Sequence, residues 1–147
     1  MTAHALIDAL AHAGIGRLVV VPASGLERVC DHFETRGRCV FATREEEAVA
    51  VAAGLALAGE KPLVLMAQAG VGNALNAVFT LADAYGIWFP IVVCFRGRED
   101  PNPVQRVSAE RTQRVLDALD CAELTWHDPG ALLSLVAKEQ RWIRCHV

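Results

Sequence analysis

Three adjacent carboxylates, Glu45, Glu46 and Glu47, are the residues of this sequence best suited to acid–base chemistry. They begin an otherwise apolar segment that continues to residue 58 and consists almost entirely of Ala, Val, Leu and Gly. A helix without a polar face is normally buried, so its first turn would bring these carboxylates to the edge of a core or an interface. A carboxyl group partly removed from water at such an edge is suited to proton transfer.

An ordinary structural role is the alternative for these acids. Thr43 and Glu46 have the spacing of a capping box, and acidic side chains in the first turn of a helix complement its dipole. These effects account well for Glu46 and Glu47. Glu45 lies closest to the junction with the preceding apolar segment, so helix stabilisation and catalysis both stay open for it.

A glycine-rich segment, Gln68-Ala-Gly-Val-Gly-Asn73, follows an apolar run at residues 63–67. Gly70 and Gly72 would let a ligand approach the backbone closely, and free amides at the start of the next helix could bind an anion. Leu75 breaks the G-x-G-x-x-G pattern, and no Lys follows as a P-loop requires. A tight turn explains the two glycines equally well.

Other polar motifs carry weaker signals. Arg96 and Arg98 follow the apolar run 90–95 and could hold a substrate anion, although a solvated charged loop is the alternative. Ser24 lies in a Pro-Ala-Ser-Gly turn that lacks the first glycine of a nucleophile elbow, so we predict no hydrolase serine. The five histidines have no metal-ligand spacing, and we predict no metal site on this chain.

Apolar periodicity and turn residues predict alternating strands and helices. Strands are expected at residues 18–21, 39–42, 63–67, 90–95, 123–126 and 142–147. Helices are expected at 3–13, 26–36, 44–58, 74–85, 106–119 and 129–140, the last with Asp128 as cap and Pro129 in its first turn. Continuous apolar strands are covered on both faces. The predicted fold class is therefore α/β, three layers around a mostly parallel sheet of five or six strands.

The carboxyl ends of parallel strands meet at one edge of a sheet, where ligands bind. Four predicted loops, 22–25, 42–47, 68–73 and 96–105, follow such strand ends. We therefore expect the polar and glycine residues of these loops to share one rim, namely Ser24, Glu45, Gln68, Gly70, Gly72, Asn73 and Arg96.

Composition narrows the class of protein. A length of 147 residues fits one domain, predicted to span 1–147, and a net charge of -3 offers no basic footprint for nucleic acid. No apolar run is long enough for a membrane span, and the first residues do not resemble a signal peptide. Five cysteines without a C-x-x-C pair indicate reduced thiols and a cytoplasmic protein. The excess of small apolar residues suits a surface hidden against a partner.

Several motifs together resemble a known family. They are Thr43-Arg-Glu-Glu-Glu-Ala with a following Ala53-Gly54, Ala67-Gln-Ala-Gly-Val-Gly-Asn-Ala, and Phe95-Arg-Gly. In this combination the chain resembles, over essentially its whole length, the pyrimidine-binding (PYR) domain of thiamine diphosphate enzymes. The similarity is greatest to the sulfopyruvate decarboxylase α-subunit and phosphonopyruvate decarboxylase families, which the turn at residues 21–24 also resembles.

The resemblance implies a role for each candidate residue. Glu45 would hydrogen-bond the pyrimidine N1′ of thiamine diphosphate and take part in the proton transfer that activates the cofactor. The cofactor site would also include Gln68, Gly70, Gly72 and Asn73. The substrate would be a small anionic 2-oxo acid that loses carbon dioxide. Its second anionic group would be bound by one or more of Ser24, Arg96, Gln105 and Arg106.

One family motif is missing. Enzymes of this family hold Mg²⁺ and diphosphate with a Gly-Asp-Gly motif, which this sequence does not contain. The resemblance therefore predicts a half-site that a separate β subunit completes with Gly-Asp-Gly, Mg²⁺ and diphosphate. A homodimer of this chain is also expected.

The substrate is only partly constrained by the resemblance. Arg106 stands where phosphonopyruvate decarboxylases tend to carry a histidine, which favours conversion of 3-sulfopyruvate to sulfoacetaldehyde and carbon dioxide. A phosphonopyruvate decarboxylase subunit, an acetolactate-synthase-like carboligase subunit and a non-catalytic α/β binding module remain the alternatives.

Overall fold

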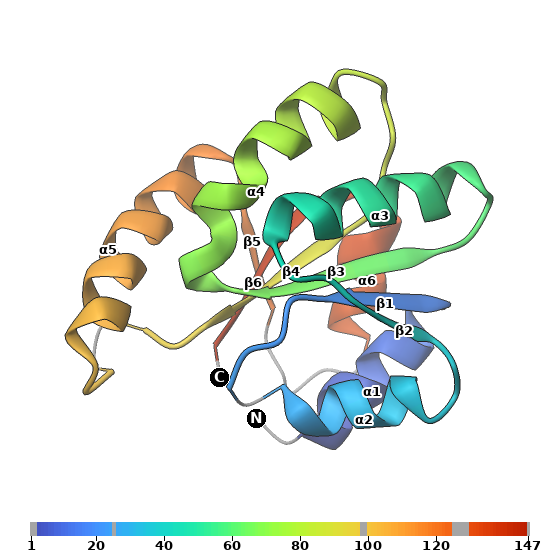
Figure 1. Cartoon of the computed structure of the whole chain (residues 1–147), viewed down its shortest axis with the longest axis horizontal. Helices are drawn as coiled ribbons and strands as arrows, with labels where there is room; N and C mark the ends of the chain where they lie inside the picture. The colour runs from blue at the N-terminus through green and yellow to red at the C-terminus, as the bar shows by residue number, and fades with distance from the viewer. Residues whose placement is uncertain (1–2, 25, 98–99, 125–129, 147) are drawn as a thin grey trace.

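The computed structural model describes residues 3–24, 26–97, 100–124 and 130–146, with side chains from residue 7 onward. Strands and helices alternate along these ranges (Figure 1). The strands are β1 (Arg17–Val20), β2 (Cys39–Phe41), β3 (Pro62–Ala67), β4 (Ile91–Phe95), β5 (Ala122–Leu124) and β6 (Trp142–His146). The helices are α1 (Ala3–His12), α2 (Glu27–Glu34), α3 (Glu45–Leu57), α4 (Val71–Ala77), α5 (Pro103–Ala118) and α6 (Ala131–Ala137). Two short segments flank α4, a 3₁₀ turn η1 (Gln68–Gly70) and a π-helical segment η2 (Val78–Asp83).

The described strands form one sheet with the order β2-β1-β3-β4-β6-β5, and every neighbouring pair is parallel. In the central strand β3, Val64 and Met66 face one core while Leu63 and Leu65 face the other. This alternation follows from the two-residue period of a strand. Because both faces are covered, the strands read as continuous apolar runs, and the predicted α/β class with a parallel sheet is confirmed.

Helices cover both faces of the sheet, as Figure 1 shows, with α3, α4 and α5 on one face and α1, α2 and α6 on the other. Helix α3 packs against the sheet through small residues, Ala48, Val49, Ala52 and Ala53. Its other face is open in this chain, where the Leu57 side chain is 73% exposed. An apolar helix that is only half buried by its own chain leaves surface for another molecule.

Two helices begin earlier than the sequence pattern predicts. Residues 68–73, predicted to be a turn, form η1 and the first turn of α4, because Gly70 adopts ordinary helical dihedral angles (φ −87°, ψ −12°). Helix α5 begins at Pro103, not at 106, because the Asn102 side chain accepts a hydrogen bond from the Val104 amide. Asp128 and Pro129, the predicted start of the last helix, lie outside the described residues, and α6 ends at Ala137, before the predicted residue 140.

All five cysteines are free, and Cys30, Cys94 and Cys145 are buried. Burial raises the pKa of Cys39 to about 12 and the pKa of Cys121 to about 11. No helix within the described ranges is long and apolar enough to span a bilayer. In the same ranges, no group of three or more His, Cys, Asp or Glu side chains is arranged to hold a metal ion.

Candidate active site

Glu45 is the first residue of α3, and residues at the start of α4 hold its carboxylate. Its Oε2 accepts a hydrogen bond of 2.9 Å from Nδ2 of Asn73. A Cβ placed on Gly70 would overlap the Glu45 carboxylate. The structure therefore brings together three predicted site residues from two segments, and leaves the Glu45 side chain partly exposed to a ligand.

The two glycines of this segment differ in what surrounds them. Gly70 is buried and has an ordinary helical backbone, so its missing side chain matters for space and not for backbone conformation. Gly72 is exposed, and no heavy atom lies within 4 Å of the position that a Cβ would take. The predicted role of Gly72 at the cofactor stays a prediction.

Glu46 and Glu47 interact with their immediate neighbours. Arg44 hydrogen-bonds to Glu46 and thereby lowers its pKa. Oε2 of Glu47 accepts hydrogen bonds from the Thr43 hydroxyl (2.7 Å) and amide (2.8 Å), which lower the pKa of Glu47. The predicted capping box between Thr43 and Glu46 is wrong because α3 begins one residue later, with Arg44 at the N-cap. Of the three acids, Glu45 is the one tied to a second helix.

Gln68 links three elements at the site edge, and its side chain is fully buried. Its Nε2 donates to the Gln105 carbonyl at 2.9 Å, and its Oε1 accepts from the Arg96 amide at 2.8 Å. Its own carbonyl accepts from the Thr112 hydroxyl at 3.1 Å. The geometry gives Gln68 a positioning function between β3, β4 and α5, and its predicted cofactor contact stays a prediction.

Three of the four predicted substrate residues line one pocket of about 210 Å³. Its polar groups come from Ser24, Arg96 and Gln105, and its remaining lining from Ala23, Ala67 and Cys94. The pocket lies at the carboxyl ends of β1, β3 and β4, as expected for a parallel sheet. Ala67 ends β3 three residues before Gly70, so the pocket and Glu45 belong to the same rim.

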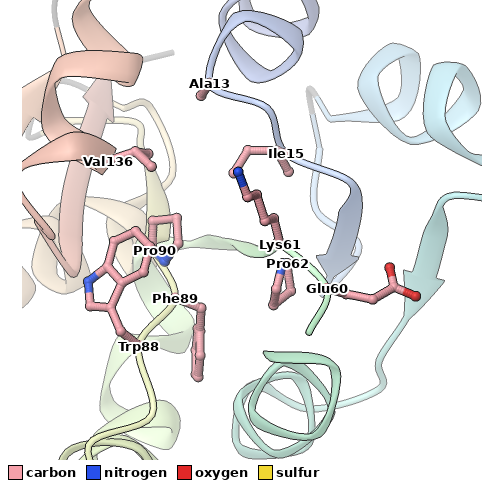
Figure 2. Close-up of a pocket in the computed structure, with 9 residues that line it drawn as sticks. All are labelled: Ala13, Ile15, Glu60, Lys61, Pro62, Trp88, Phe89, Pro90 and Val136. Carbon is pink, nitrogen blue, oxygen red and sulfur yellow. The ribbon is translucent and has the colours of Figure 1, made fainter. Parts of the chain in front are cut away.

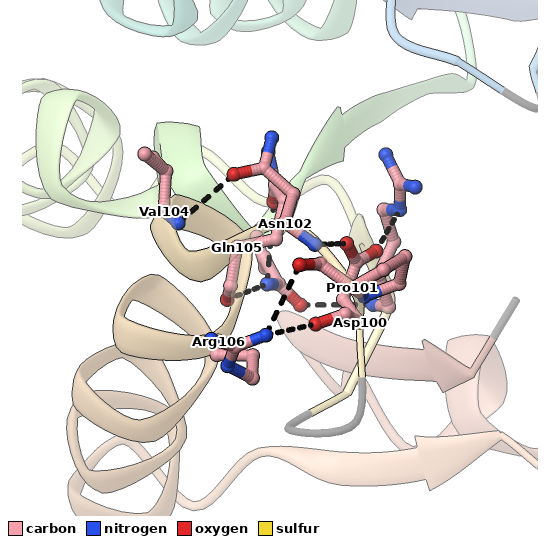
Figure 3. Close-up of polar contacts among 8 residues, drawn as sticks. Asp100, Pro101, Asn102, Val104, Gln105 and Arg106 are labelled. Atoms are coloured by element: carbon pink, nitrogen blue, oxygen red, sulfur yellow. Dashed lines mark hydrogen bonds and ion pairs between the residues drawn. The ribbon is translucent and has the colours of Figure 1, made fainter.

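Arg106, the fourth predicted substrate residue, is not among the residues that line this pocket. Its Nη1 donates to the carbonyl oxygens of Asp100 and Pro101 at 3.1 Å each, as Figure 3 shows. Arg106 thereby ties residues 100 and 101 to the first turn of α5.

The sequence interpretation missed Asp100, a buried carboxylate in that loop. Its Oδ2 lies 2.7 Å from Nε of Arg96. Its Oδ1 accepts a hydrogen bond from the Asn102 amide at 2.8 Å, and Figure 3 shows these two residues. Asn102-Pro103 was a readable signal for the start of α5, since Asn is a preferred N-cap and Pro suits the first helical position. Nothing in the sequence marks Asp100, because its burial depends on tertiary contacts such as the ion pair with Arg96.

A second cavity, of about 300 Å³, lies at the opposite edge of the sheet, before β3 and β4 begin. Figure 2 shows its lining, in which Trp88, Phe89 and Pro90 face Ile15 and Lys61. The Trp88 indole donates to the Glu139 carbonyl at 2.9 Å, which fixes that wall. None of the predicted site residues lines this cavity, so it is separate from the rim.

Comparison with known proteins identifies the family of the chain that carries this rim. The family model described as "Thiamine pyrophosphate enzyme, N-terminal TPP binding domain" matches residues 1–117. The chain belongs to this thiamine pyrophosphate enzyme family. The matched region contains Glu45, Gly70 and Asn73. It also contains every residue that lines the pocket of about 210 Å³ around Arg96, the Arg96 pocket.

Relatives of known name are similar to most of the chain. "Sulfopyruvate decarboxylase subunit alpha" of Methanocaldococcus jannaschii is 30% identical over 119 residues, which are 79% of this chain and 70% of that protein. The protein of the same name from Methanococcus maripaludis is 26% identical over 135 residues, covering 90% and 81%. "Sulfopyruvate decarboxylase" of Methanosarcina acetivorans is 30% identical over 92 residues, 63% of this chain but 24% of that protein.

A solved structure supports the fold alone. A 2-oxoglutarate:ferredoxin oxidoreductase from Magnetococcus marinus superposes with a TM-score of 0.64 at 16% identity. The match covers 99% of this chain and 28% of the oxidoreductase chain.

Proposed function

We propose that this chain is the pyrimidine-binding half of a thiamine diphosphate-dependent decarboxylase that converts 3-sulfopyruvate to sulfoacetaldehyde and carbon dioxide. The observation that carries the proposal is the arrangement of Glu45, Gly70 and Asn73 in a chain of this family. Its relatives named as sulfopyruvate decarboxylases support the choice of substrate.

The described residues fit the pyrimidine end of the cofactor. Gly70 leaves space for the Glu45 carboxylate, and Asn73 fixes one of its oxygens, while the side chain stays partly exposed. Thiamine diphosphate, when bound, supplies the electron sink for loss of carbon dioxide from a 2-oxo acid. Glu45 would hold a proton at N1′ of the pyrimidine ring, and Asn73 would keep the Glu45 carboxylate oriented for this proton transfer.

A separate β subunit completes the site in this proposal. It contributes the Gly-Asp-Gly motif, Mg²⁺ and the diphosphate site, and the motif is missing from this sequence. Exposed apolar side chains on and beside the packed pair α3 and η2, including Leu57, Phe79 and Tyr85, support an interface on this face. In the absence of the β subunit we expect this chain to pair with itself through the same face, which light scattering with and without β would detect.

The Arg96 pocket is the proposed site for the substrate's sulfonate. Its size of about 210 Å³ suits a small acid, and the guanidinium of Arg96 with the Ser24 hydroxyl and the Gln105 amide offers donors to an anion. Gln68 holds the backbone of both Arg96 and Gln105, so the pocket is organised by this chain.

A reducing compartment is consistent with the cysteines. All five are free, and two of them have a pKa raised by burial, which keeps them as thiols. We assign the protein to the cytoplasm on this basis.

Reconstitution with the partner subunit tests the function. Carbon dioxide release from 3-sulfopyruvate should require both chains, thiamine diphosphate and Mg²⁺, and Glu45→Gln should abolish most of it while Glu46→Gln leaves it intact. If the complex instead prefers phosphonopyruvate, or forms acetolactate from pyruvate, the proposed substrate is wrong. A complex that binds no thiamine diphosphate and turns over none of these acids would be a non-catalytic binding module.

A further inference from the structure

We propose that Asp100 makes the substrate pocket selective for a singly charged anion, by holding Arg96 through Nε and balancing its charge. The inference rests on the proposed function, because it specifies which anion the pocket of that enzyme accepts. It concerns a buried carboxylate that contacts neither Glu45 nor Asn73 in any described interaction.

The contact geometry orients the guanidinium. Asp100 binds Arg96 at Nε, and its side chain is 4% exposed whereas that of Arg96 is 39% exposed. Among the described residues, no hydrogen bond or ion pair involves the Nη atoms of Arg96. A guanidinium held at Nε keeps its Nη donors for a further anion, in a fixed plane.

Both partners of this pair are anchored by other residues. The Arg96 amide donates to the Gln68 side chain. Arg106 donates to the carbonyls of Asp100 and Pro101, as seen in Figure 3. Asp100 also accepts from the Asn102 amide, next to the start of α5. The pair is therefore in place before a ligand arrives.

Charge balance then decides which anion fits. Of the described residues that line the pocket, Arg96 is the one with a charged side chain, and Asp100 offsets that charge. A sulfonate brings one negative charge, whereas a phosphonate, like a phosphate group, carries close to two near neutral pH. Placing a second negative charge beside a buried carboxylate is unfavourable, so the pocket favours a C3 sulfonate over a C3 phosphonate.

Asp100→Asn in the assembled enzyme tests the selectivity. We expect the ratio of kcat/KM for 3-sulfopyruvate to that for 3-phosphonopyruvate to fall at least tenfold, through opposite changes in KM with little change in kcat. Asp83→Asn is the matched control, because Asp83 also binds an arginine at Nε, that of Arg141 at 3.0 Å, away from the pocket. A ratio for Asp100→Asn within twofold of the wild-type ratio overturns the proposal.

A second measurement needs neither catalysis nor the variant. In the full wild-type chain labelled with ¹⁵N-arginine, methanesulfonate should shift the Nε–H signal of Arg96 at concentrations at least tenfold below those needed for methylphosphonate. Arg96→Lys identifies the signal. Equal sensitivity to the two anions contradicts the proposal. If the assembled enzyme decarboxylates neither acid, the proposed function is wrong, and this titration still decides whether the pocket prefers a singly charged anion.

Discussion

The rim of this protein has two halves that are built differently. The Arg96 pocket is cross-linked by its own chain, since Gln68, Asp100 and Arg106 each hold part of it. The Glu45 carboxylate is held by one amide, that of Asn73, and by the space that Gly70 leaves. Its helix also exposes an apolar face. With the proposed function, this difference predicts that substrate recognition is preorganised in this chain, whereas the proton-transfer site is completed by a partner.

Gly70→Ala gives the largest expected effect on the Glu45 half. The new methyl group overlaps the Glu45 carboxylate, so decarboxylation by the assembled enzyme should fall about 10²-fold or more, the usual contribution of a positioned acid or base. Gly16→Ala is the matched control, because its methyl group would meet only the Lys61 carbonyl oxygen at an ordinary 3.9 Å, and activity should stay within about twofold. Steady-state kinetics of both variants, with unfolding curves to verify folding, make the comparison. Full activity of Gly70→Ala would contradict the proposed position of Glu45.

Gln68→Leu should destabilise the protein by removing the cross-link that holds the Arg96 pocket. It leaves the Arg96 amide and the Gln105 carbonyl without their buried partner, which should lower the free energy of unfolding by about 2–4 kcal/mol. Thr112→Val removes one hydroxyl bond to the Gln68 carbonyl and should cost about 1 kcal/mol. Urea unfolding of the two variants measures both values. Equal stability of Gln68→Leu and wild type would show that the pocket is not held by this cross-link.

Asn73→Ala should have a smaller effect than Gly70→Ala, because it frees the Glu45 carboxylate without displacing it. Loss of one hydrogen bond to a charged group predicts a decrease in kcat of roughly tenfold with unchanged KM for the substrate. Asn76→Ala, an exposed residue one turn further along α4, is the control and should behave like wild type. A raised KM with unchanged kcat would instead assign Asn73 to substrate binding.

The smallest expected effect is a change in the pH dependence of stability. It concerns Cys121, which belongs to neither half of the rim. Burial raises the folded-state pKa of Cys121 to about 11, so the folded chain holds this proton more tightly than the unfolded chain does. Stability from this group is therefore present below the ordinary thiol pKa and is lost as the pH rises toward 11. Urea unfolding between pH 8 and about 11 should show a shallower loss in Cys121→Ala than in wild type. An identical pH dependence in Cys121→Ala and wild type would refute the raised pKa of Cys121.

The fold was largely predictable because its strands are buried on both faces. Continuous apolar runs such as Leu63-Val-Leu-Met identify central parallel strands, and the strand-end rule then predicts one rim. Glu45 and Asn73 were both expected on that rim, but their direct contact follows from the packing of α3 on α4.

Other features of the site depend on tertiary structure. The need for Gly70 comes from the position of Glu45, which is distant in sequence, and not from its own backbone angles. Asp100 is buried against Arg96, with which it forms an ion pair, and no local sequence pattern encodes this contact. Tertiary contacts also explain why Arg106 does not line the pocket. Its guanidinium binds the carbonyl groups of Asp100 and Pro101 instead.

Exchange of the C2 proton of thiamine diphosphate for deuterium is the most direct test of Glu45. It would be measured in the complex with the β subunit, comparing wild type with Glu45→Gln and with Glu46→Gln, whose side chain pairs only with neighbouring Arg44 among the described contacts. We expect exchange to slow about 10²-fold or more in Glu45→Gln and to stay near the wild-type rate in Glu46→Gln. Near-normal exchange in Glu45→Gln would contradict the assignment of Glu45 as the proton-transfer residue.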